Sequence, residues 1–283
     1  MKKIWVLLLV IFVILVIRSL RESLFFSGKE RVNLVVYGKN ANFFSLGLKD
    51  DLHYKIPFYP DLQLVTPGGY GYYRVGALGK LVNLEKNPEI LRRTFSLTTS
   101  TFVNYYFLPK KMNIYYGKEE ESGKPSFTDI FFSETNASFI DSIYLYLAFL
   151  GKRPQEFNVL MEISSLKKDG SVRFSLDEFN KKFQGYFYQK VFREEKKNIQ
   201  IIYSKNITAA SYMGQILEGT GIRVADLSQE EKTTKGCFIK ENLSIHSKTA
   251  IEISNFFKCD LVKENTGVYD IIYVIGERER DWE

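Results

Sequence analysis

The sequence predicts a mixed α/β protein, with two domains following a membrane-spanning N-terminal helix. Short runs of β-branched and aromatic residues alternate with segments whose apolar residues recur at helical spacing. Of the 283 residues, 45% are hydrophobic and 15% aromatic, a composition that supports packed cores and excludes a disordered chain. One long apolar run stands at the N-terminus, and the roughly 255 residues after it are enough for two domains.

The apolar run comprises residues 4–17, which carry no charge and follow Lys2 and Lys3. Because this run has no polar face, it does not suit a surface helix of a globular protein. At 1.5 Å per residue it would cover about 21 Å of a hydrocarbon core about 30 Å thick. We therefore predict a retained signal-anchor and tether over residues 1–27, with the rest of the chain outside the cytoplasm. The alternative is a cleaved signal peptide, but Ile17-Arg18-Ser19 is a poor cleavage site.

The segment after the anchor begins with strands. Residues 32–37 (VNLVVY) form a strand candidate that Gly38 ends, and residues 42–66 continue as short alternating segments up to a Pro-Gly turn at 67–71. The apolar residues then recur at helical spacing, first after Val75 and again after Asn87-Pro88. The remaining predictions for this part are a helix over 89–97, a strand over 102–107, a charged loop over 117–126, a helix over 141–150, a strand over 156–163 and a helix over 176–183.

These motifs carry a family resemblance. The stretch from Ile56-Pro57 to Pro67-Gly68 resembles a segment of the LytR-CpsA-Psr (LCP) family that runs from an Ile-Pro-Arg-Asp core to an Ile-Pro-Gly turn. Residues 87–91 (NPEIL) are similar to the family's Gly-Pro-Glu-Leu-Leu helix start, and residues 103–106 (VNYY) to its Ile-Asp-Tyr-Tyr strand. The resemblance implies an extracytoplasmic LCP-like α/β domain over residues 28–195.

The family's chemistry is only partly represented. LCP enzymes use acidic residues, arginines and a divalent metal to hold a polyprenyl pyrophosphate and transfer its glycopolymer to the cell wall. Asn40 stands where the family has the Asp of a Gly-x-Asp motif, and Phe58 and Tyr59 stand where it has Arg-Asp. Aromatic rings cannot neutralise a pyrophosphate, and an amide is a weak ligand for a hard cation. The resemblance therefore implies a protein with most transferase residues missing.

The remaining candidate site residues are few. Arg74, Asp50 and Asp51 are the candidates for binding, and Asp61 and Arg74 are the candidate catalytic residues if the protein is active. The leading prediction is a non-catalytic LCP-like cell-envelope protein that binds or scaffolds wall glycopolymer and needs no cofactor. One alternative is an active transferase that uses Mg²⁺ and a polyprenyl-phosphate lipid. Another is a receptor or assembly partner without a polymer ligand.

A charged hinge at residues 194–197 introduces a C-terminal unit over residues 196–283. We predict two similar halves, each a strand, a helix and a strand. The unit resembles the small α/β domain at the C-terminus of LytR proteins, to which the family attaches no catalytic role. The predicted elements are a strand over 199–203, a helix over 209–218, a strand at 222–224, a strand at 237–239, a helix over 248–257 and a strand over 269–275.

The chain has only two cysteines, Cys237 and Cys259, both in the C-terminal unit. Because an outside-facing domain can form and keep a disulfide, we predict a Cys237–Cys259 bond, with two buried free thiols as the alternative. The two histidines, His53 and His246, are far apart and have no further ligands at zinc spacing, so no metal site is predicted from them.

The net charge of +6 comes from scattered pairs of basic residues. It fits either a solvated surface or attraction to anionic lipid headgroups and wall polymers. The expected partners are the cytoplasmic membrane and an anionic wall glycopolymer or polyprenyl-phosphate lipid. Nucleic acid is not an expected partner, because the predicted compartment lacks it.

Overall fold

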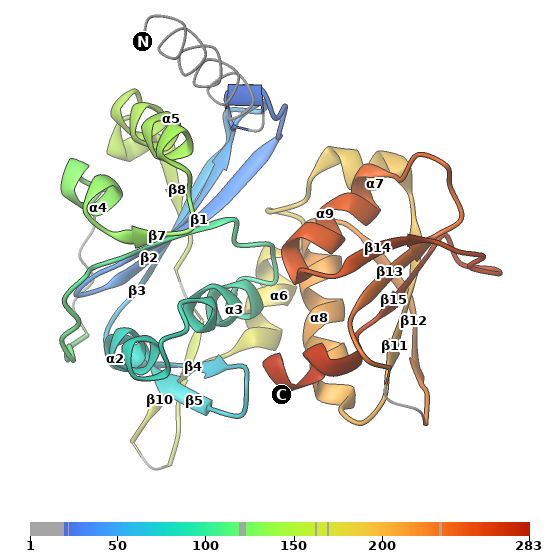
Figure 1. Cartoon of the computed structure of the whole chain (residues 1–283). Helices are drawn as coiled ribbons and strands as arrows, with labels where there is room; N and C mark the ends of the chain where they lie inside the picture. Colours follow the sequence, from blue (N-terminus) through green and yellow to red (C-terminus); the bar gives the residue numbers. More distant parts are fainter. Residues whose placement is uncertain (1–19, 22, 119–122, 162, 169, 232–233) are drawn as a thin grey trace, which may run out of the picture.

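The computed structural model describes residues 20–21, 23–118, 123–161, 163–168, 170–231 and 234–283. Within these residues the strands form three sheets, of six, four and five strands, which helices cover and connect (Figure 1). The predicted mixed α/β class is therefore confirmed. The division of the chain at residue 195 stays a prediction. We call the described residues through 195 the N-terminal part of the chain. Those from 196 onward are the C-terminal part.

The six-stranded sheet has the order β7-β6-β1-β2-β3-β8. All seven residues of β1 are buried, because apolar cores cover both faces of the sheet. Val35 and Tyr37 point into one core, whereas Leu34 and Val36 point into the other. Burial on both sides explains why residues 34–37 of this strand are apolar without a break. The bounds are β1 Arg31–Tyr37, β2 Ala41–Gly47, β3 His53–Phe58, β6 Tyr105–Leu108, β7 Glu134–Thr135 and β8 Phe157–Val159.

The four-stranded sheet has the order β5-β4-β10-β9. Its central strands β4 and β10 are parallel, and β4 also pairs with β5 as an antiparallel hairpin around the predicted Pro-Gly turn. The backbone amides of Gly68 and Gly69 in this turn donate to the carbonyl oxygen of Glu283 at 2.9 and 3.1 Å. The turn is thus tied to the C-terminal residue. The bounds are β4 Leu62–Thr66, β5 Gly71–Arg74, β9 Ser164–Leu166 and β10 Val172–Phe174.

The helices of the N-terminal part follow local signals in the sequence. Pro88 occupies the N-cap of α3, and Ser126 and Ser138 cap α4 and α5 through their side chains. Helix α6 has the predicted bounds, because its apolar residues recur at helical spacing around Phe179 and Phe183. The bounds are α2 Val75–Glu85, α3 Glu89–Thr98, α4 Phe127–Phe131, α5 Phe139–Leu150, η1 Pro154–Glu156, α6 Leu176–Phe183 and α7 Lys190–Glu195.

The five-stranded sheet of the C-terminal part has the order β12-β11-β15-β13-β14. Two strand-helix-strand units flank a central strand: β11-α8-β12 and β13-α9-β14, each with parallel strands. The strand predicted at 269–275 does not close the second unit but lies between β11 and β13, and β14 takes the expected place. The bounds are β11 Asn198–Tyr203, α8 Ile207–Thr220, β12 Arg223–Gln229, β13 Phe238–Glu241, α9 Lys248–Phe257, β14 Asp260–Lys263, β15 Ile271–Val274 and η2 Gly276–Asp281.

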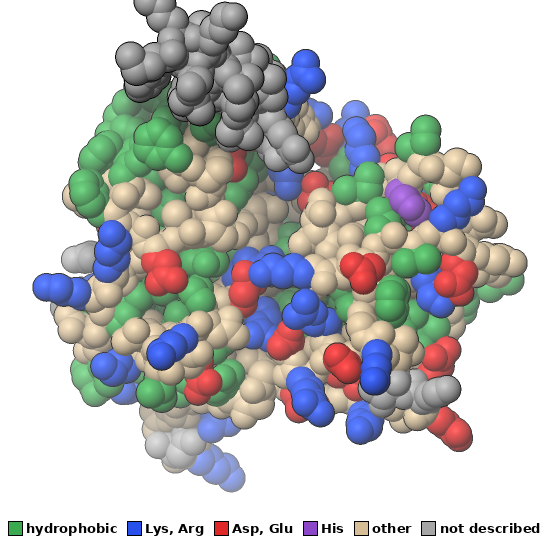
Figure 2. Space-filling view, viewed as in Figure 1, with side chains coloured by type: hydrophobic (Ala, Val, Ile, Leu, Met, Phe, Trp, Pro, Cys, Tyr) green, Lys and Arg blue, Asp and Glu red, His purple; other side chains and the backbone are tan. Residues whose placement is uncertain are grey.

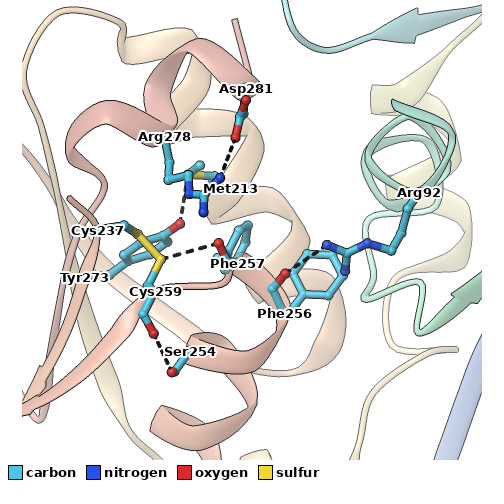
Figure 3. The surroundings of a disulfide bond; sticks show 10 residues. All are labelled: Arg92, Met213, Cys237, Ser254, Phe256, Phe257, Cys259, Tyr273, Arg278 and Asp281. Atoms are coloured by element: carbon cyan, nitrogen blue, oxygen red, sulfur yellow. Dashed lines mark hydrogen bonds and ion pairs between the residues drawn. A yellow bond between two sulfur atoms is a disulfide. The ribbon is translucent and has the colours of Figure 1, made fainter. Parts of the chain in front are cut away.

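The predicted disulfide is confirmed. Cys237 precedes β13 and Cys259 follows α9, and their Cα atoms lie 4.7 Å apart across the bond (Figure 3). Both residues are buried in the core of the C-terminal part. The bond therefore joins the start of β13 to the end of α9.

The two parts meet through an aromatic and glycine-mediated contact. Phe102 of the N-terminal part stacks on Phe256 of α9 with ring centroids 4.4 Å apart. Arg92 of α3 points at the same residue, donates to its carbonyl oxygen at 3.0 Å and lies over its ring (Figure 3). Gly219 of α8 touches Ser100 so closely that an added Cβ would lie 1.7 Å from the carbonyl oxygen of Ser100. No side chain larger than that of glycine therefore fits at residue 219 without a shift of the backbone.

The structure corrects the predicted location. No helix among the described residues is both long and apolar enough to cross a bilayer. The predicted span at residues 4–17 lies outside the described residues. The described residues therefore do not support the predicted location, which was a single-pass protein of the cell membrane with the bulk of the chain outside the cytoplasm.

Candidate functional site

Asp61 and Arg74 lie together at one end of the six-stranded sheet. Asp61 stands between β3 and β4, and Arg74 ends β5 and caps α2. An Arg74 guanidinium nitrogen lies 3.6 Å from Asp61 Oδ1, and about a third of each side chain is exposed. At that distance the two groups form an ion pair but not a direct hydrogen bond. Of the predicted site residues, these are the two that the fold brings together.

The surroundings of Arg74 are fixed by a close backbone crossing. Gly76 N donates to Pro60 O at 2.8 Å, and Tyr115 N donates to Gly76 O at 2.9 Å. A Cβ at Gly76 would lie 2.3 Å from the carbonyl oxygen of Tyr115, so only glycine fits there. The crossing segment carries Tyr116, whose ring lies 4.5 Å from the guanidinium of Arg74. Arg74 is therefore held between a carboxylate and an exposed aromatic ring.

The turn at Gly38-Lys39-Asn40 lies at the same end of the sheet. It joins β1 to β2, and the Tyr37 hydroxyl before it donates to Val75 O and accepts from Gly79 N, both at 2.8 Å. Burial raises the pKa of Tyr37 to about 12, so this hydroxyl stays protonated. Lys39 is exposed and lines a cavity of about 340 Å³. Lys39 is the middle residue of the segment that stands where the family has its Gly-x-Asp motif. It was not among the binding residues predicted from the sequence.

Asp50 and Asp51 lie at the opposite end of β3. Asp50 accepts from Arg31 at 2.8 Å, and Asp51 pairs with Lys152 and with His53 Nε2. The Lys152 ammonium, by hydrogen bonding and by its charge, lowers the pKa of Asp51. These carboxylates therefore already have partners within the chain.

The two ends of β3 are too far apart for one small ligand. Asp51 precedes β3 and Asp61 follows it, and six residues of strand span about 20 Å at roughly 3.3 Å per residue. Asp50 and Asp51 therefore do not lie beside Arg74, contrary to what a shared pyrophosphate site would need.

A divalent metal does not fit the residues beside Arg74. Among the described residues, no group of three or more His, Cys, Asp or Glu side chains converges as a metal site. Asp61 is the single carboxylate in the pair, and it faces a guanidinium. Mg²⁺ is usually held by one or two carboxylates together with phosphate oxygens and waters, without a competing cation.

A cavity of about 750 Å³ lies in the C-terminal part beside Cys237. Side chains of both charges gather along the boundary between the two parts (Figure 2). The Glu279 carboxylate accepts from the amides of residues 204–206 before α8, and Asp281 pairs with Arg93 at 3.1 Å and with Arg278 at 3.2 Å. Because the carboxylates of Glu279 and Asp281 are bonded to other groups of the chain, they do not form a free cluster of negative charge in this cavity.

No family model matches this sequence, and no curated protein matches it. Solved structures do match at low similarity. TagT of Bacillus subtilis is 11% identical with a TM-score of 0.38, over 56% of this chain and 91% of that one. TagV of the same organism is 10% identical with a TM-score of 0.38, over 55% and 96%. A LytR-CPS2A-psr family protein, YwtF (TagT), solved with bound octaprenyl pyrophosphate lipid, gives 11% and 0.38 over 56% and 90%. At this level of similarity the matches do not establish a shared family or activity.

Proposed function

We propose that this protein binds a cell-envelope glycopolymer with anionic groups and does not transfer it, as a divergent LCP-like protein. The observation that carries the proposal is the arrangement of Arg74 against Tyr116, both at an accessible surface. A guanidinium binds phosphate or carboxylate oxygens in a bidentate manner, and an aromatic ring offers an apolar surface for the face of a sugar. Lys39 adds a second cation at the same end of the sheet.

The proposal of binding without transfer is supported by what surrounds Arg74. Phosphoryl transfer from a pyrophosphate requires several cations, or a metal, to stabilise charge on the transferred group. Here Asp61 offsets the charge of Arg74, and the other two predicted acids lie beyond β3 with partners of their own. The transferase remains the alternative, with Asp61 and Arg74 as its residues.

Binding is tested by titrating the full chain with a glucosylated poly(glycerol phosphate) oligomer in a calorimeter. Loss of a charge-assisted hydrogen bond to a charged group costs about 1.5–3 kcal/mol, so Arg74→Ala should weaken binding about 10- to 100-fold. Arg223→Ala is the matched control, because Arg223 is an exposed arginine at the start of β12. Equal affinities of wild type and Arg74→Ala would contradict the assignment of the site.

Transfer is tested separately. The full chain is incubated with a polyprenyl-pyrophosphate-linked glycan and Mg²⁺, and lipid phosphate release is measured. We expect no release above that of a sample without protein. Release that disappears in Asp61→Asn would establish the transferase alternative and contradict the proposal.

A further inference from the structure

The four-stranded sheet has one apolar and one polar face. Because side chains alternate along a strand, Leu62 and Leu64 of β4 and Phe174 of β10 share the face that enters the core. The residues between them point to the other side. By the register of the four strands, this polar face carries Tyr72 and Arg74 of β5, Gln63 and Val65 of β4, Arg173 of β10, and Ser165 of β9.

The polar face is ordered by contacts across the strands. Arg74, Gln63, Arg173 and Ser165 are direct cross-strand neighbours in one row. Arg173 Nε donates to Gln63 Oε1 at 3.3 Å, and its guanidinium lies 4.6 Å from the centre of the Tyr72 ring. With strands about 4.8 Å apart, Arg74 and Arg173 stand roughly 10 Å apart on the same face. The row thus spaces two cations along a line that starts at the proposed binding residue.

A cavity of about 330 Å³ lies over this face where the two parts of the chain meet. Tyr72 and Arg173 line it from the sheet, Lys167 lines it from the loop after β9, and Tyr212 of α8 lines it from the C-terminal part. Tyr72 is 49% exposed, so its ring is available to a ligand. A cavity of this size accommodates one or two sugar units.

The charges around the cavity favour an anion. Arg173 and Lys167 are its cations, and Asp177 is the one carboxylate among its lining residues. Helix α6 begins at the cavity wall, and its first turn carries Asp177 and Glu178, which offset the partial positive charge of the helix N-terminus. The two basic side chains, and not the helix, are therefore the groups that would hold an anion. Burial, with a further effect from Tyr72, raises the pKa of Tyr212, which therefore keeps its hydroxyl proton as a donor.

We propose that this cavity binds one anionic sugar unit, with its ring against Tyr72 and its phosphate or carboxylate at Arg173 and Lys167. The inference rests on the proposed function and extends it. One polymer can reach both Arg74 and Arg173, because they lie on the same face of the sheet. The second site also assigns the C-terminal part a role, because Tyr212 lines the cavity.

The test is titration of the full chain with four separate probes: glucosamine 6-phosphate, glucuronate, inorganic phosphate and glucose. The two anionic sugars should bind more tightly than glucose, and the tighter one identifies the anion as phosphate or carboxylate. Arg173→Ala should weaken binding of that sugar about 10-fold or more. Tyr72→Ala should weaken binding of the sugar more than that of inorganic phosphate, because the ring contacts the sugar directly but the phosphate only through Arg173. Arg223→Ala again serves as the control.

Folding is controlled by two further changes. Arg173→Lys keeps the charge but loses the bond to Gln63, so its melting temperature should fall by no more than that of Arg173→Ala. Lys167→Ala removes an exposed charge, so its melting temperature should match the wild type. Lys167→Ala should weaken anionic-sugar binding about 2- to 5-fold, as expected for an exposed charge pair.

The outcomes separate the two proposals. If Arg74→Ala weakens polymer binding but Arg173→Ala and Lys167→Ala change no affinity, the cavity proposal is wrong and the proposed function stands. If the wild type binds neither the polymer nor the anionic sugars, both are wrong.

Discussion

Reduction of the Cys237–Cys259 bond should destabilise the C-terminal part by a calculable amount. The bond closes a loop with a sequence separation of 22. The loop-entropy relation gives about 3 kcal/mol for this length at 25 °C, because the reduced unfolded chain regains the freedom that the bond removes. Both cysteines are about 5% exposed, so little solvation of the folded state changes on reduction.

The assay uses Trp282 as a local reporter. This residue is 4% exposed, and the centre of its ring lies 5.5 Å from the centre of the Phe257 ring. Phe257 stands two positions before Cys259. The chain has two tryptophans, so a Trp5→Phe background leaves Trp282 alone. Guanidinium unfolding is followed by its fluorescence, with and without a phosphine reductant. The reductant should lower the free energy of unfolding by about 3 kcal/mol.

The matched control is the double variant Cys237→Ala/Cys259→Ala. It should be about as unstable as the reduced protein and should not respond to reductant. A loss below about 1 kcal/mol in the reduced protein would refute the reasoning, because it would mean that the unfolded chain gains little freedom when the bond opens.

Two further predictions test packing and burial. Gly219→Ala should destabilise the protein by more than about 1 kcal/mol, because the new Cβ would meet the carbonyl oxygen of Ser100, whereas Gly214→Ala in the same helix should be neutral or stabilising. Equal denaturation midpoints for the two variants would contradict the close contact. Burial raises the pKa of Tyr37 to about 12, so its contribution to stability is full below pH 10 and is lost as pH rises to about 12. Alkaline unfolding should therefore be less steep in Tyr37→Phe, and an unchanged pH profile would exclude this assignment.

Elements with strong local signals could be predicted from the sequence. Helices α6 and α9 have the predicted bounds, since amphipathic spacing and a following change of composition mark both ends. The strand predicted at 102–107 begins instead at Tyr105. The Asn33 side chain donates to Phe102 O at 2.9 Å and to the Thr101 hydroxyl at 3.1 Å, and these bonds take the place of a strand ladder. Such a partner, about 70 positions away, leaves no mark in local periodicity.

Residues 194–197, where a hinge stays a prediction, show the same limit of local composition. Residues 190–195 form helix α7, and the Glu195 carboxylate accepts from the backbone amides of Lys248 and Thr249 at the start of α9. Local composition showed charge, which is typical of a linker, but the fold uses one of these charges as a remote helix cap.

The closeness of Asp61 and Arg74 could be expected from the sequence, whereas their role as a site stays a prediction. Asp61 and Arg74 lie close because β4 and β5 form a hairpin, which a Pro-Gly turn predicts. Arg173 was not predicted, because its place beside Gln63 depends on a parallel pairing of β10 with β4. Parallel pairing has no turn signal, and a single basic residue between two apolar ones looks like an ordinary edge strand.

The pairing of β4 with β10 also affects how the chain folds during synthesis. Leu62 pairs with Val172, so 110 positions separate the partners. A ribosome adding about 5–20 residues per second needs several seconds to deliver β10 after β4 has emerged. During that interval β4 presents an unpaired edge, and closing so long a loop slows folding. Strand β5 covers only the opposite side of β4, so the side that awaits β10 stays open to pairing with other nascent chains until β10 is made.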